Sequence, residues 1–185
     1  MNLYAIPPLF TSILFLIVGI YIYLYNRKSV INITFALEWF SVFIWQFGYF
    51  VVYSTTNKQV ALLWTKILFI GVIFLPTIFY HFVIKLLKME KKGIIIGLNY
   101  IISLIFVISL FFTKHFVSGI DTFYWGFQTK AGFLHTSFLV FFSSLYISCY
   151  YLLFKTYHKI RIKFPLEVIR FKYILCFIDV KKNFT

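Results

Sequence analysis

The stretch VALLWTKILFIGVIFLPTIFYHFVIKLL, residues 60–87, decides the fold class of this chain. It is apolar over most of its length and is interrupted by Lys66 and Pro76. A helix needs about 20 mostly apolar residues to cross the roughly 30 Å hydrocarbon core of a bilayer. Residues 60–87 are therefore predicted to form a membrane-spanning helix.

Apolar stretches of similar length lie on both sides of this one. They cover residues 4–25, 31–53, 93–112 and 132–154. In the whole chain 62% of the residues are hydrophobic and 12% are charged, whereas a soluble domain carries about 25% charged residues. The apolar residues therefore cannot form one buried core beneath a polar surface. We expect an all-α membrane protein, a polytopic helix bundle whose five complete transmembrane helices form a single membrane-embedded domain over residues 1–185.

The sequence after residue 154 has a different, basic character. Lysines and arginines recur from Lys155 to Lys172, and a short apolar stretch from Tyr173 to Ile178 follows. At 1.5 Å per residue this stretch covers about 10 Å, too little to cross a bilayer. We expect a cytoplasmic loop and then an incomplete sixth helix at residues 171–180. The chain is then expected to be a truncated or frameshifted product, or a fragment of a longer protein.

The positively charged residues are divided unevenly between the predicted loops. With the N-terminus outside, Lys58, Lys114 and Lys130 face outward, and twelve basic residues lie in the cytoplasm: Arg27, Lys28, Lys85, Lys88, Lys91, Lys92, Lys155, Lys159, Arg161, Lys163, Arg170 and Lys172. The positive-inside rule therefore predicts that the N-terminus is outside. The net charge of +13 is segregated into loops and forms no stripe on one face, so nucleic acid is not an expected partner.

Two ionisable residues, Glu38 and Lys66, lie within predicted spans. Such residues mark functional sites by default. Each lies about 10 Å from a different membrane face, counted at 1.5 Å per residue, so a direct salt bridge between them is not expected. Lys66 is expected to extend its side chain outward to the interface. Two interpretations stay open: separately solvated end residues, or residues that line a lumen or face a ligand.

Pro76 lies within residues 60–87, five residues after Gly71. Proline removes a helical hydrogen bond and clashes with the preceding turn, so a kink is predicted near residues 72–76. The kink is either a hinge or a static packing bend. His81 and His135 have no metal-type spacing and are interpreted as satisfied polar residues.

The outward loop before residues 132–154 is rich in aromatic residues, from Phe123 to Phe127. These side chains form either an interfacial belt or the floor of an extracellular ligand pocket. The sequence has no phosphate-binding glycine loop, no nucleophile elbow, no zinc-binding helix motif and no pair of carboxylates in one span. Neither an enzymatic activity nor a cofactor or metal is therefore expected.

The order of residues in the second and third spans resembles a known family. The resemblance rests on Trp45, Gly48-Tyr49, Trp64-Thr65-Lys66-Ile67, Gly71, Leu75-Pro76, Val117-Ser118-Gly119, Tyr124-Trp125-Gly126, Ala131-Gly132-Phe133 and Arg170 to Leu175. Together these motifs, from about residue 8 to residue 175, are similar to the N-terminal seven-transmembrane sensor region of bacterial histidine kinases.

This resemblance implies a multi-pass receptor module in the bacterial plasma membrane, part of a two-component system. Its helices would shift on sensing a small-molecule or membrane signal and pass the shift to a cytoplasmic signalling partner or a second copy, with lipid as a further partner. The chain is expected to lack a kinase output of its own. Candidate residues for the ligand or for signal transmission are Trp64, Lys66, Gly71, Pro76, Tyr124, Trp125, Gly126 and Gly132. Trp64, Lys66 and residues 124–132 are expected to surround one outward-facing cavity.

The alternative is a small membrane transporter or pore subunit. That function calls for polar residues aligned through several helices, or for broken helices in matching halves of the chain. In the sequence only Pro76 interrupts a span, and residues 93–112 and 132–154 contain no lysine, arginine, aspartate or glutamate. These features favour the sensor.

Overall fold

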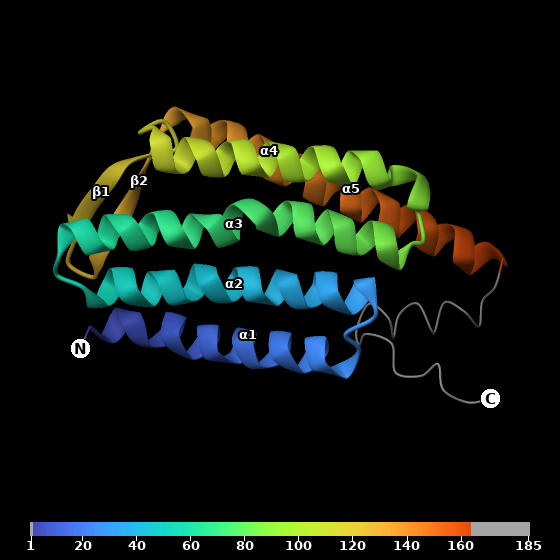
Figure 1. Cartoon of the computed structure of the whole chain (residues 1–185), viewed down its shortest axis with the longest axis horizontal. Coiled ribbons are helices and arrows are strands. Elements are labelled where there is room, and N and C mark those ends of the chain that lie inside the picture. The colour runs from blue at the N-terminus through green and yellow to red at the C-terminus, as the bar shows by residue number, and fades with distance from the viewer. Residues whose placement is uncertain (1, 164–185) are drawn as a thin grey trace.

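A computed structural model describes residues 2–163 of the chain. Within this range the chain is mostly helical. Five long helices follow one another and run up and down in a bundle (Figure 1): α1 (Ile6–Tyr25), α2 (Val30–Ser54), α3 (Lys58–Leu86), α4 (Gly93–Phe112) and α5 (Phe133–Lys163). Short 3-10 helices at Leu3–Ala5 and Glu90–Lys92 precede α1 and α4. All five long helices are long and apolar enough to cross a membrane.

The helix boundaries follow from local capping. The Asn57 side chain accepts hydrogen bonds from the backbone N–H groups of Gln59 and Val60, at 2.8 and 3.3 Å. It thereby satisfies two donors at the start of α3 that have no partner within the helix. Ser29 caps α2 in the same way through the N–H of Asn32. Short polar turns thus separate α1 from α2 and α2 from α3.

The chain is mostly helical as expected, but it is not helical throughout, because residues 117–131, which were expected to be a loop, form a β-hairpin. Strands β1 (Val117–Phe123) and β2 (Gly126–Ala131) pair antiparallel, with Ile120 opposite Thr129. The turn between them consists of Tyr124 and Trp125. Strand pairing gives the backbone N–H and C=O groups of this segment hydrogen-bond partners that they would otherwise have to find in water. This explains why the connection between α4 and α5 is an ordered hairpin.

Helix α5 is longer than the span predicted for residues 132–154. It continues to Lys163, so the cytoplasmic loop expected from residue 155 is helical at least to that point. No glycine or proline interrupts residues 133–163, and basic residues are good helix formers. The partial sixth helix predicted at residues 171–180, and the family motif from Arg170 to Leu175, lie outside the described residues.

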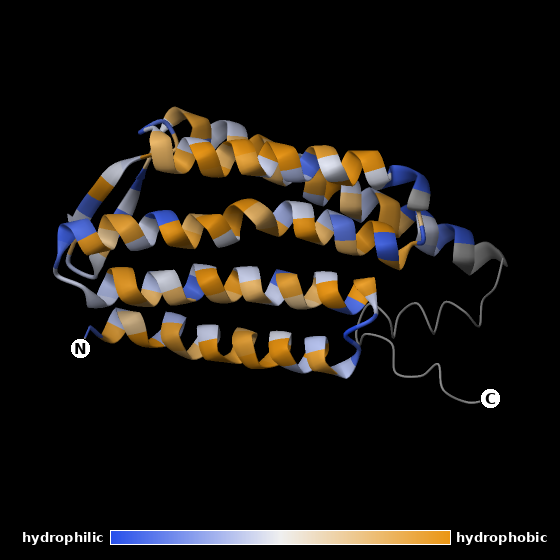
Figure 2. Cartoon of the chain, viewed as in Figure 1, coloured by the Kyte–Doolittle hydropathy of each residue, from blue (hydrophilic) through white to orange (hydrophobic). Residues whose placement is uncertain are grey.

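Helix α3 is the centre of the bundle. In its most apolar stretch 67% of the residues are buried, against 17–22% in the corresponding stretches of the other helices. It packs against α2, α4 and α5, and α1 packs against α2. The outer helices therefore expose apolar faces suited to lipid, and Figure 2 shows hydrophilic residues gathered mostly in the turns at the two ends of the bundle.

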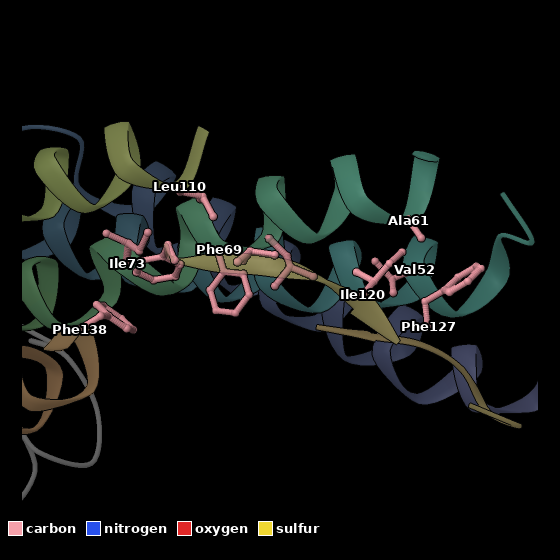
Figure 3. Packing of buried hydrophobic residues seen from close by; sticks show 11 residues of the cluster. Val52, Ala61, Phe69, Ile73, Leu110, Ile120, Phe127 and Phe138 are labelled. Carbon is pink, nitrogen blue, oxygen red and sulfur yellow. The ribbon is translucent and has the colours of Figure 1, made fainter. Parts of the chain in front are cut away.

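Two hydrophobic clusters divide the interior along the bundle axis. The hairpin-side cluster contains residues from the hairpin and from four of the helices, among them Val52, Phe69, Ile120, Phe127 and Phe138 (Figure 3). The far-end cluster joins α3, α4 and α5, with Tyr80, Val83, Ile96 and Cys149 among its members. The hairpin therefore covers one end of the bundle as part of the core.

Candidate functional site

A cavity of about 370 Å³ lies between α2, α3, α5 and β2, on the hairpin side of the bundle. On α2, Trp45 and Tyr49 line it from positions one helical turn apart. On α3, Phe69, Val72 and Leu75 line it at intervals of three residues. Residues at these spacings share one face of a helix, so two neighbouring helices each present one face to the same space.

Helix α5 and strand β2 complete the wall. The lining residues of α5 are His135, Phe138, Leu139 and Phe142, and those of β2 are Gln128, Thr129 and Ala131. The α5 residues follow the i, i+3, i+4, i+7 pattern of one helix face. Because β2 leads directly into α5, the hairpin and the start of α5 close the cavity together.

The polar groups of the cavity gather at its hairpin side. Gln128 and Thr129 belong to β2, and His135 lies in the first turn of α5. The His135 ring packs edge-on against Phe69 and Phe116, with centroid distances of 5.6 and 5.5 Å. Its Nδ1 is buried and has no hydrogen-bond partner among the described residues. The expectation that His135 is a fully satisfied polar residue is therefore not met for this atom.

Below the cavity, away from the hairpin, three aromatic rings stack. Phe142, which lines the cavity, stacks on Tyr146 at 4.7 Å, and Tyr146 stacks on Phe79 of α3 at 5.0 Å. We call these three residues the aromatic stack. It joins α3 to α5 beneath the cavity.

The aromatic stack also positions a hydroxyl beside the acidic residue of α2. The Tyr146 hydroxyl donates to Oε1 of Glu38 over 3.5 Å, at the long end of the hydrogen-bond range. Oε2 of Glu38 is buried and has no hydrogen-bond partner among the described residues. A carboxyl group in such a place is costly, which makes Glu38 a functional candidate that the sequence already indicated.

Lys66 contacts a different helix from Glu38. Its Nζ lies 3.4 Å from the carbonyl oxygen of Phe111 and 5.9 Å from the centre of the Phe111 ring. Phe111 is in the last turn of α4, at the hairpin end, so the lysine extends toward that end as expected for a snorkelling side chain. Lys66 is not among the residues that line the cavity.

The other candidates in α3 belong to the interface between α2 and α3. The Trp64 ring meets Phe47 at 5.6 Å. At Gly71 an added Cβ would collide with the carbonyl oxygen of Ser41, so only glycine allows this approach of the two helices. Pro76 is buried, and α3 passes through it without a break. None of the three lines the cavity, and their roles in sensing stay predictions.

The candidates in the hairpin lie at its turn and base. Trp125 stacks on Phe123 at 4.7 Å, and Tyr124 is 82% exposed. Gly126 has a φ of +129°, a conformation that favours glycine. At the base, an added Cβ on Gly132 would collide with the carbonyl oxygen of His115. The turn does not line the cavity, whereas Gln128, Thr129 and Ala131 of the same predicted region do.

The N-terminal residues hold the hairpin turn in place. The Asn2 side-chain amide donates to the carbonyl oxygen of Trp125 at 2.7 Å and to that of Tyr53 at 2.8 Å. It thereby links the start of the chain to the end of α2 and to the turn. The sequence gives no signal for this contact, because the three segments are far apart along the chain.

The cavity lining on α5 was missed as well, although one signal for it exists. His135, Phe138, Leu139 and Phe142 show the spacing of one helix face. On a helix that is apolar all round this spacing does not stand out. The faces that meet become visible only in the folded bundle.

Comparison with known families gives this arrangement a context. Residues 7–164 match the family described as the N-terminal 7TM region of histidine kinase. The chain belongs to this family. The resemblance seen in the sequence is thus confirmed. No curated protein and no solved structure matches the chain.

Membership of this family supports a membrane protein that takes part in sensing and signal transduction. The family describes the sensor region of a kinase and not its catalytic unit. Within residues 2–163 the structure has no group of three or more histidine, cysteine, aspartate or glutamate residues that is placed to hold a metal ion. The cavity and the contacts beneath it are therefore the candidate site for receiving a signal.

Proposed function

We propose that this chain is a membrane-embedded receptor module that receives a signal in the cavity and passes it along α3 and α5 to the cytoplasmic side. The observation that carries this proposal is the position of the cavity. It lies between faces of α2, α3 and α5, and the latter two helices have 29 and 31 residues. At 1.5 Å per residue they measure about 43 and 46 Å, enough to pass through the hydrocarbon core.

The proposed orientation has the N-terminus and the hairpin outside. Lys58, Lys114 and Lys130 belong to the hairpin end of the bundle. Among the described residues the opposite end carries Arg27, Lys28, Lys85, Lys88, Lys91, Lys92, Lys155, Lys159, Arg161 and Lys163. This asymmetry supports placing that end in the cytoplasm of a bacterial cell. The cavity then lies in the outer half of the membrane.

A bound ligand can shift a conformational equilibrium only if it binds one state more tightly than the other. In this bundle a ligand bound in the cavity would contact Phe138 and Phe142 of α5 and Val72 of α3, which are among the residues that line it. Phe142 is also the member of the aromatic stack nearest the cavity. Through the Tyr146 hydroxyl, the stack contacts Glu38 of α2. A change in the cavity would therefore alter how α5 packs on α3, and the continuous α5 would carry the change to the far end.

The proposed recipient is a cytoplasmic signalling partner, or a second copy of the receptor, that contacts the far end of the bundle. The basic residues of that end also suit the anionic headgroups of the inner leaflet. In this proposal the module itself performs no chemical reaction. It biases the arrangement of helices that its partner senses.

The test measures the distance between α3 and α5 at the far end. Spin labels are placed at Lys85 and Lys159 in a chain with Cys149→Ala and Cys176→Ala, reconstituted in nanodiscs. Val72→Phe fills part of the cavity in place of a ligand. Val140→Phe is the matched control, because Val140 lies on α5, is 66% exposed and does not line the cavity.

We expect Val72→Phe to shift the distribution of distances between the two labels. Val140→Phe should leave that distribution as in the parent chain. Identical distributions in all three proteins would mean that the cavity and the far end are not coupled, and the proposal would fail.

A further inference from the structure

The chemistry of the cavity wall restricts the ligand that the proposed receptor can take. Nine of the twelve lining side chains are aliphatic or carry an aromatic ring other than histidine, and no lysine, arginine, aspartate or glutamate is among the twelve. An ion placed there would lose part of its hydration without gaining a partner of opposite charge, which is unfavourable. Charged ligands are thus disfavoured by the wall itself.

Apart from the indole N–H of Trp45 and the hydroxyl of Tyr49 on α2, the polar part of the wall is small and lies on one side. Gln128 offers an amide donor and acceptor, Thr129 a hydroxyl, and His135 an imidazole. All three lie in or next to β2, so a ligand group that bonds to them must be at the hairpin side. Toward the far end the wall ends at Phe142 and the aromatic stack. The cavity is therefore amphipathic along the bundle axis.

Its size is a further restriction. A volume of about 370 Å³ lies near the lower end of the range of about 300–1,000 Å³ for small-molecule pockets. A folded peptide does not fit into this space. A compact molecule does, and one that is largely apolar also partitions into the bilayer around the bundle.

We propose that the cavity binds an uncharged small molecule, taken from the membrane, with an aromatic or other apolar body and one hydrogen-bonding group such as a hydroxyl or carbonyl. Its apolar body contacts Phe69, Phe138 and Phe142, and its polar group meets Gln128, Thr129 or His135. This inference rests on the proposed function, because it names the ligand class of the same site.

The test uses quenching of Trp45, which lines the cavity. The other tryptophans are replaced by Trp39→Phe, Trp64→Phe and Trp125→Phe, and the full chain is placed in nanodiscs. The uncharged probe is 2-(4-bromophenyl)ethanol, whose bromine quenches indole fluorescence on contact. The matched charged probes are 4-bromophenylacetate and 2-(4-bromophenyl)ethylamine.

We expect the uncharged probe to quench Trp45 in a saturable manner, and 2-phenylethanol to reverse the quenching by competition. The charged probes should give no saturable quenching. Because Val72→Phe adds bulk to the wall, it should weaken the probe by about tenfold or more. Val140→Phe should bind the probe like the parent chain.

Saturable quenching that is equal for all three probes would overturn the ligand class. Quenching that never saturates, or quenching that Val72→Phe leaves unchanged, would show that the probe does not bind in the cavity. In that case lipid or another segment fills the cavity. The spin-label experiment does not depend on any of these probes. If distances still shift there, the receptor function stands and only the ligand assignment fails.

Discussion

The Tyr146 hydroxyl of α5 contacts the Glu38 carboxyl of α2 over 3.5 Å, beneath a cavity that both helices help to enclose. Tyr146 is held for this contact by Phe142 on one side and Phe79 on the other. Glu38 is the single acidic residue among the described residues of the long helices. It therefore lies directly beneath the cavity, in contact with the aromatic stack.

Replacing Tyr146 with Phe keeps the stacked ring and removes the hydroxyl. We expect the free energy of unfolding to fall by about 0.5–1.5 kcal/mol, because the Glu38 carboxyl loses its hydrogen-bond donor. In a Glu38→Gln background the same replacement should cost less, since the neutral amide is cheaper to bury. Thermal unfolding of the four proteins gives the coupling energy. Strictly additive effects would show that the two residues do not interact.

Replacing Gly71 with Ala tests the close approach of α2 and α3. The new methyl group would collide with the carbonyl oxygen of Ser41, so the helices must separate or shift, at a cost of about 1–3 kcal/mol. Gly97→Ala is the control, because no heavy atom outside its own helix lies within 4 Å of the added Cβ. That change should be neutral or slightly stabilising. Equal melting temperatures for the two variants would rule out tight packing at Gly71.

Replacing Asn2 with Ala removes both hydrogen bonds that link the N-terminus to Tyr53 and Trp125. The hairpin should then open more often, so hydrogen exchange at the amides of residues 117–131 should become faster. The control is Asn26→Ala, which alters a turn at the opposite end of the bundle. If hydrogen exchange in the hairpin is equally slow in Asn2→Ala and in the parent chain, the strands do not need the Asn2 hydrogen bonds to stay paired.

The long helices were predictable from the sequence because apolar length is what a bilayer demands. The predicted spans at residues 31–53 and 93–112 lie within one residue of α2 and α4 at both ends. The hairpin was not predictable in the same way. Its turn, Tyr124 and Trp125, lacks the Asn-Gly or Asp-Gly signal of a two-residue turn, and its strands have only a few buried residues, such as Ile120 and Phe127.

The candidate site was predictable only in part. Glu38 stood out because a lone acid in an apolar helix is costly, but its partner Tyr146 lies 108 residues away in the chain. Which faces of apolar helices meet depends on packing, and so Phe69, Phe138 and Phe142 gave no distinct signal. Trp64 and Lys66 were expected at the cavity, whereas Lys66 lies against α4.

The proposed orientation makes a prediction about chemical access in intact cells. In a chain with Cys149→Ala and Cys176→Ala, single cysteines are introduced by Tyr124→Cys and by Lys91→Cys. Both positions are exposed, at opposite ends of the bundle. A membrane-impermeant maleimide should label the first variant in intact cells and the second only after the membrane is opened, because the proposed orientation places the basic end in the cytoplasm. The reverse pattern would invert the orientation and place the cavity in the inner half of the membrane.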